Sequence, residues 1–133
     1  MNPHYRTVAS RASHRCEYCH APEVVFNLHF EVEHIEPQTV SRSNEEANLA
    51  LACRSCNLYK GVHLTGWDEV SQSYERLYHP RVDLWKDHFE IDNDQITIKG
   101  LTSVGRATII QLRINREAQL LARLRWVKLG LFP

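Results

Sequence analysis

The sequence lacks any apolar run long enough to span a membrane, and its first residues lack the pattern of a secretory signal peptide. It also contains no internal repeat, no low-complexity tract and no clear linker. We therefore expect one compact unit, residues 1–133, in the cytoplasm, where thiols stay reduced and available to a metal ion. A membrane is not among the expected partners, and no pattern indicates an oligomeric state.

A net charge is also absent, because 16 lysines and arginines balance 16 aspartates and glutamates. This balance argues against a polycation that coats nucleic acid without specificity. The charges are unevenly distributed, however: residues 23–46 are mainly acidic, and residues 99–128 are mainly basic. An acidic segment beside a basic one suits an enzyme that holds both a cation and a polyanion. The alternative is that both segments are ordinary solvated faces.

Cysteine is scarce, and its positions are informative. The four cysteines form two Cys-x-x-Cys pairs, Cys16 with Cys19 and Cys53 with Cys56, and none is left over. Each pair directs two thiolates to one centre, and tetrahedral zinc takes four such ligands. We therefore predict one structural zinc with no open coordination position. The alternatives are four buried free thiols or a redox centre, although redox chemistry needs only one such pair.

The residues between and just after the two pairs form a further motif. They stand in the order Glu33-His34-Ile35, Pro37, Asn48-Leu49, Leu51, Asn57 and Lys60-Gly61. Together with the cysteines, this order and spacing resemble the HNH endonucleases of the ββα-metal fold, over about a third of the chain. The resemblance implies an endonuclease that hydrolyses phosphodiester bonds in DNA.

The resemblance also implies a role for each motif residue. His34 would be the general base, because a neutral imidazole accepts a proton near pH 7. Asn48 corresponds to the middle residue of the motif, and its amide can bond backbone on both sides of a loop and hold the histidine's strand. Asn57 corresponds to the third residue, which makes the motif an HNN variant. His63 is the alternative for that position, but it lies beyond Gly61, off the expected helix.

A catalytic divalent cation follows from the same resemblance. Glu33 stands where the family usually has a metal-binding Asp or His, and the amide oxygen of Asn57 can join it. Such oxygen ligands suit magnesium or manganese better than a second zinc. Strict strand alternation would place Glu33 and His34 on opposite faces, so a shared site requires the strand to twist or break near Pro37.

The expected fold is α+β, with a zinc-bound ββα core in residues 15–61 and an extension in residues 62–133. Alternation of apolar and polar residues predicts a strand over residues 24–35, and residues 49–52 and 54–60 read as a second strand and a helix. A helix before Ser13 precedes this core. The extension is expected to hold a connector over 62–73 and irregular chain over 74–89, with a short turn of helix around 83–88. A hairpin of 89–91 with 95–99, a helix over 102–114 and a last helix from its cap at Asn115 to Leu129 should follow.

The basic extension is where we expect contact with DNA. On the last predicted helix Arg116 and Arg123 share one face, and Lys60 can reach a phosphate from the core. The face expected to be buried is the apolar stripe of Leu120, Leu121, Leu124 and Val127.

Two other functions remain compatible with the sequence. One is a non-catalytic zinc-binding module that binds nucleic acid, which would need the four cysteines but neither His34 nor Asn57. The other is an RNA-directed nuclease, which the sequence does not favour because it shows no exposed set of aromatic residues for base stacking.

Overall fold

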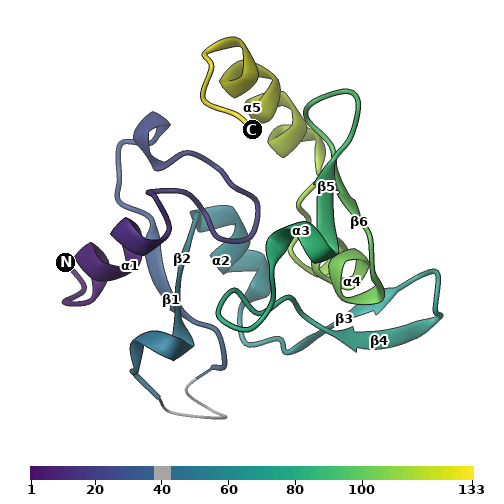
Figure 1. Ribbon diagram of the computed structural model, residues 1–133, viewed down its shortest axis with the longest axis horizontal. Coiled ribbons are helices and arrows are strands. Elements are labelled where there is room, and N and C mark those ends of the chain that lie inside the picture. Colours follow the sequence, from purple (N-terminus) through teal and green to yellow (C-terminus); the bar gives the residue numbers. More distant parts are fainter. Residues whose placement is uncertain (38–42) are drawn as a thin grey trace.

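The computed structural model describes residues 1–37 and 43–133 and has an α+β fold of short helices and two-stranded antiparallel sheets (Figure 1). No helix within these residues is both long enough and apolar enough to cross a membrane. In chain order the elements are α1 (Tyr5–Arg11), η1 (Glu23–Val25), β1 (Glu31–His34), η2 (Glu46–Asn48), β2 (Leu49–Ala52), α2 (Arg54–Lys60), β3 (Thr65–Asp68), β4 (Ser73–Arg76), α3 (Trp85–His88), β5 (Phe89–Ile91), β6 (Ile98–Gly100), α4 (Ser103–Gln111) and α5 (Glu117–Lys128).

The core is the predicted strand–strand–helix unit. β1 and β2 pair antiparallel from Glu31 opposite Ala52 to His34 opposite Leu49, and α2 packs against both strands. β2 is buried along its whole length because α1 also packs on it. Cys53 begins α2, where its sulfur accepts a hydrogen bond from the backbone N–H of Cys56. The second cysteine pair is therefore part of the helix start.

The first strand is shorter than predicted. Residues 23–25 form the 3-10 helix η1, and only residues 31–34 are strand. β2 offers four residues, so the ladder can satisfy only four residues of its partner. The carboxylate of Glu23 fixes the segment before the strand by accepting hydrogen bonds from the backbone N–H of Phe30 and the hydroxyl of Tyr5. The apolar and polar residues before Glu31 also alternate, but β2 is too short to pair with them, so they do not form a strand.

The extension contains a hairpin that the sequence did not predict. β3 and β4 pair where a connector and irregular chain were expected, and α4 packs on β3. Gly66 permits this packing, since a Cβ there would lie 2.5 Å from the carbonyl oxygen of Ala107. Asp68 is fully buried and accepts two hydrogen bonds from Arg106, at 2.8 and 3.0 Å. The predicted hairpin of β5 with β6 and the predicted helix α4 are confirmed.

Helix α5 buries a different face from the predicted one. Its buried residues are Gln119, Arg123 and Trp126, whereas Leu121 and Leu124 are 53% and 38% exposed. Asn115 does not cap the helix, because its amide bonds both the N–H and the carbonyl of Ile98. Hydrogen-bond partners in other parts of the fold determine which face of α5 is buried. The periodicity of the helix sequence gives no information about those partners.

Several hydrogen bonds connect the extension to the core. The indole N–H of Trp85 donates to the carbonyl of Tyr18 at 2.9 Å, and the Gln111 amide donates to the carbonyl of Tyr59 at 3.1 Å. Buried apolar residues of both segments form one hydrophobic cluster. The first cysteine loop, residues 16–19, is therefore covered by the extension.

Candidate metal centre and active site

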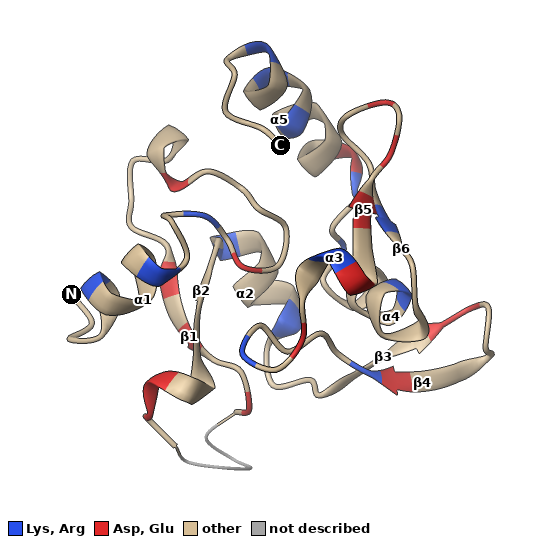
Figure 2. Ribbon diagram, viewed as in Figure 1, with Lys and Arg blue, Asp and Glu red and all other residues tan. Residues whose placement is uncertain are grey.

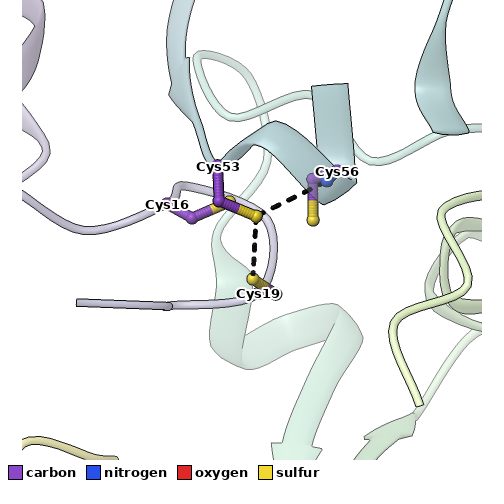
Figure 3. A group of neighbouring side chains, drawn as sticks. All are labelled: Cys16, Cys19, Cys53 and Cys56. Carbon is purple, nitrogen blue, oxygen red and sulfur yellow. Dashed lines mark hydrogen bonds between the residues drawn. The ribbon is translucent and has the colours of Figure 1, made fainter. Parts of the chain in front are cut away.

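Four buried thiols meet at one point. The sulfur atoms of Cys16, Cys19, Cys53 and Cys56 all lie within 4.8 Å of one another, and Figure 3 shows them converging from the first loop and the start of α2. Four thiolates are the ligand set of a closed tetrahedral zinc site. Among the His, Cys, Asp and Glu side chains of residues 1–37 and 43–133, this is the group that could hold a metal ion.

The protonation of these thiols also fits a metal centre. The pKa of Cys19 lies well below its ordinary value because hydrogen bonds from Cys16, Cys53 and Cys56 stabilise its thiolate. The pKa of Cys56 is raised instead, first by its hydrogen bond with Cys16. Metal ligands must be deprotonated, so a cation bound between the four sulfur atoms would be held by four thiolates. This donor set fits zinc.

His34 occupies the last position of β1. Its imidazole is half-buried, and Nε2 lies 2.8 Å from Oδ1 of Asn44. Its backbone pairs with Leu49, and the ammonium of Lys60 donates to its carbonyl oxygen at 3.3 Å. The strand end, the loop before η2 and helix α2 therefore all position this histidine.

Glu33 points away from His34, into the protein. It is 6% exposed, the hydroxyl of Tyr18 donates to one carboxylate oxygen, and Lys60 Nζ lies 3.1 Å from the other. Burial raises the pKa of this carboxyl, opposed by the nearby charge of Lys60. The ladder is regular through His34, so Glu33 and His34 keep the alternation of a strand, and the chain bends only after them, at Ile35 and Glu36.

Asn57 contacts Glu31 instead of Glu33. Its amide nitrogen donates to one carboxylate oxygen of Glu31, and Arg54 donates to the other at 3.0 Å. The predicted cation site of Glu33 with Asn57 finds no support in these contacts, because both oxygens of Glu33 accept bonds from Tyr18 and Lys60 while Asn57 bonds Glu31. Glu31 was missed by the sequence reasoning, although strand alternation places it on the same face as Glu33.

Asn48 has the contacts predicted for it. Its Oδ1 accepts a hydrogen bond from the N–H of Glu36 at 2.9 Å, and its Nδ2 donates to the carbonyls of Glu36 and Ser43. The backbone carbonyl of Asn48 also accepts from the N–H of Ile35. The two sides of the loop are thus tied together directly after His34.

Lys60 is not available to a phosphate, which corrects another prediction. Its side chain is 2% exposed, and its ammonium donates to the Glu33 carboxylate and to the carbonyls of His34 and Ile35. His63, the alternative third motif residue, is exposed beyond Gly61, with Nδ1 3.0 Å from the carbonyl of Lys60. Asn57 contacts β1 through Glu31, whereas His63 lines a pocket with Ile35 and Glu36, directly after the end of β1.

The segment that contains both cysteine pairs and the motif residues also matches a known protein family. Residues 16–62 match the family described as HNH endonuclease. We call residues 16–62 the HNH domain, after the family that this segment matches. The match begins at the first cysteine and ends one residue after Gly61, so it contains both cysteine pairs, His34, Asn48 and Asn57. No curated protein and no solved structure matches the chain.

Basic residues are distributed over the helices of the HNH domain and the extension (Figure 2). The prediction that Arg123 contacts DNA is wrong, because its side chain is fully buried and donates to the carbonyls of Ile96 and Ile114. Arg116 is exposed and donates to Ser55 of the HNH domain at 3.2 Å.

A group of exposed arginines surrounds Tyr59 at the boundary of the HNH domain. The guanidinium carbons of Arg113 and Arg116 lie 4.6 and 5.6 Å from the centre of the Tyr59 ring. Arg54 and Arg116 line one groove beside α2, and the Arg54 side chain is 80% exposed. We call Arg54, Arg113 and Arg116 the arginine surface.

Proposed function

We propose that the HNH domain hydrolyses phosphodiester bonds in DNA, with His34 as the general base. The observation that carries the proposal is the fixed position of His34 at the end of β1, inside a segment that matches the HNH endonucleases. Asn44 holds the ring, while β2 and Lys60 hold the backbone. A general base acts efficiently only when its geometry is preset in this way.

The chemistry assigned to His34 is proton transfer. A water molecule loses a proton to the neutral imidazole as its oxygen attacks phosphorus, and the bond to the 3′-oxygen of the preceding nucleotide breaks. Imidazole is the side chain most often used for proton transfer of this kind. Asn48 and Lys60 serve the reaction by holding the backbone at His34 and at the two residues directly after it.

Magnesium or manganese is the cofactor we propose for this reaction. When bound, such a cation neutralises charge on the phosphoryl oxygens and on the leaving oxygen. Glu33 and Asn57 do not fit it as a pair, because Tyr18 and Lys60 hold both oxygens of Glu33. The dependence of cleavage on added magnesium or manganese is therefore tested separately from the role of His34.

DNA is the proposed partner of the arginine surface. The three guanidinium groups lie around one exposed edge of α2 and present positive charge to solvent. Neutralising phosphates with such groups releases condensed counterions, which drives binding to a duplex. Only Arg54 among them forms an ion pair within the described residues, with Glu31.

One observation favours a second function, a non-catalytic zinc module that binds nucleic acid. The internal bonding of Glu33 removes the carboxylate expected to bind a catalytic cation. Such a module would keep the zinc and the arginine surface and would bind DNA without cutting it.

The deciding experiment incubates purified, zinc-loaded protein with supercoiled plasmid, with and without added magnesium or manganese. We expect cleavage that requires the added cation. His34→Ala should lower the rate by about a hundredfold to ten-thousandfold, while zinc content and DNA affinity stay near those of the parent. The matched control is His63→Ala, which removes an exposed histidine close by and should cut like the parent.

One result would reject the enzyme, and two others would change the residues assigned to it. Folded, zinc-loaded parent protein that binds plasmid without cutting it would establish the binding module. His34→Ala protein that cuts as fast as the parent would remove His34 from the reaction. Loss of cleavage in His63→Ala but not in Asn57→Ala would make His63 the third motif residue.

A further inference from the structure

Arg123 is a fully buried cation with neutral hydrogen-bond partners. Its guanidinium donates to the carbonyls of Ile96 and Ile114 and to Oδ1 of Asn115. No carboxylate in residues 1–37 and 43–133 lies within ion-pairing distance of it. Asp94, on the exposed turn between β5 and β6, interacts with it only at longer range.

The neutral groups around Arg123 do not balance the positive charge of its guanidinium. Removing a guanidinium from water is costly unless an opposite charge or a full set of acceptors replaces the solvent. The acceptor set is incomplete, because Nε of Arg123 is buried and has no hydrogen-bond partner. The ring of Phe132, whose centre lies 5.9 Å from the guanidinium carbon, adds a neutral partner but no opposite charge. A counter-charge nearby would lower the remaining cost of burial.

The four cysteines are the source of negative charge on that side of α5. Three residues of its inward and flanking face, Gln119, Ala122 and Trp126, line one groove together with Cys53. Burial lowers the pKa of Arg123, and the charges of Cys19, Cys56, Cys53 and Cys16 each oppose that shift. Gln119, Arg123 and Trp126 are the buried residues of α5, and Gln119 and Trp126 line a groove with Cys53, so Arg123 lies on the face of α5 that is turned toward the cysteines.

The guanidinium and the zinc tetrathiolate would stabilise each other. A zinc ion with four thiolates is a dianion, and a buried dianion is as costly as a buried guanidinium. Each lowers the cost of the other when both are present in a medium of low dielectric constant.

We propose that Arg123 is the counter-charge of the zinc tetrathiolate and strengthens zinc binding from outside the HNH motif. The last helix of the extension is then part of the metal site, although it supplies no ligand. Residues that support metal ligands in this way change metal affinity by about 10- to 100-fold when they are substituted.

The test measures zinc affinity of the full-length holoprotein by competition with a chromophoric chelator. Arg123→Met, which keeps the length of the side chain and removes its charge, should weaken zinc binding by about 10- to 100-fold. Arg123→Lys, which keeps the charge, should stay within a few-fold of the parent. Asn115→Ala is the matched control, because it removes hydrogen bonds from the same cluster and no charge. It should lower the thermal unfolding midpoint and leave zinc affinity within a few-fold.

The contrary outcome is equally specific. If Arg123 only connects Ile96 with Ile114, the Met and Lys variants should weaken zinc binding to the same degree, or neither should weaken it. Arg123→Gln retains a donor for these carbonyls and replaces the Met variant if the latter does not fold. Parental zinc affinity in a folded Arg123→Gln protein would overturn the proposal. None of these measurements depends on nuclease activity.

Discussion

The ammonium of Lys60 lies 3.1 Å from the carboxylate of Glu33, and both groups are buried. The same ammonium donates to the carbonyl oxygens of His34 and Ile35. One cation of the protein therefore binds three consecutive residues of the motif, at the strand end that carries the proposed general base. An internal ion pair holds this strand end in place.

Lys60→Met should destabilise the protein by about 3–5 kcal/mol at neutral pH, because it leaves the Glu33 carboxylate buried and unpaired. The loss should shrink as pH falls. Burial already raises the pKa of Glu33, and without Lys60 it should rise further, so protonation neutralises the group before the unfolded carboxyl titrates. Urea unfolding at several pH values measures both effects.

Glu33→Gln provides the control for this prediction. In the Glu33→Gln background the buried charge is absent, so adding Lys60→Met should cost much less than it does in the parent. Equal costs in the two backgrounds would show that Lys60 acts through its hydrogen bonds to backbone alone.

Asp83 should make the extension sensitive to acid. Two hydrogen bonds from Arg76 lower the pKa of Asp83 from its ordinary 3.8 to about 2. A depressed folded pKa contributes stability that is fully present above the unfolded pKa and is lost as pH falls through about 2. Asp83→Asn should therefore be less stable than the parent at pH 6, and the difference in urea midpoint should narrow toward pH 2. A constant difference across this range would be contrary evidence.

Gly105→Ala should be strongly destabilising, because a Cβ at this position would overlap the carbonyl oxygen of His88. Backbone would have to move to relieve the clash, at a cost of about 1–3 kcal/mol or more. Ile110→Ala, at a residue 58% exposed on the same helix, should change stability by about 0.5 kcal/mol or less. Thermal unfolding of the two variants compares them, and a tolerated Gly105→Ala would mean that α4 can shift away from α3.

The arginine surface should determine the salt dependence of DNA binding. Replacing Arg113 and Arg116 with alanine should weaken binding and flatten the slope of log K against log salt, by about 0.9 for each phosphate that the protein no longer neutralises. The charge-matched control is Arg125→Ala with Lys128→Ala, two exposed basic residues near the end of α5. If the control pair flattens the slope as much as the arginine pair does, DNA binds elsewhere.

Local chemistry in the sequence predicted much of the core. The two cysteine pairs require one centre whatever the chain between them does, and they form it. Asn48 makes the bonds to both sides of a loop that a short amide side chain predicts. Strand, strand and helix over residues 31–60 follow from alternation and from the glycine after Lys60.

The errors lie where distant residues decide the outcome. Arg116 and Arg123 looked alike in the sequence, yet Arg116 reaches Ser55 while Arg123 is enclosed by the carbonyls of Ile96 and Ile114. Glu33 looked like a metal ligand until Tyr18 and Lys60 proved to hold both of its oxygens. These partners lie between 9 and 61 residues away in the chain, and single-sequence periodicity contains no information about them.

The hydrogen bond from Trp85 to the carbonyl of Tyr18 gives the protein an internal optical probe. The indole also stacks on the ring of His20, with 4.0 Å between ring centres. Its donor group and its ring face are thus both in contact with the loop that carries the first cysteine pair. Indole emission responds to polarity and to stacking, so movement of this loop on zinc removal should change fluorescence without any attached label. Binding and release of the metal can then be followed in real time in the unmodified chain.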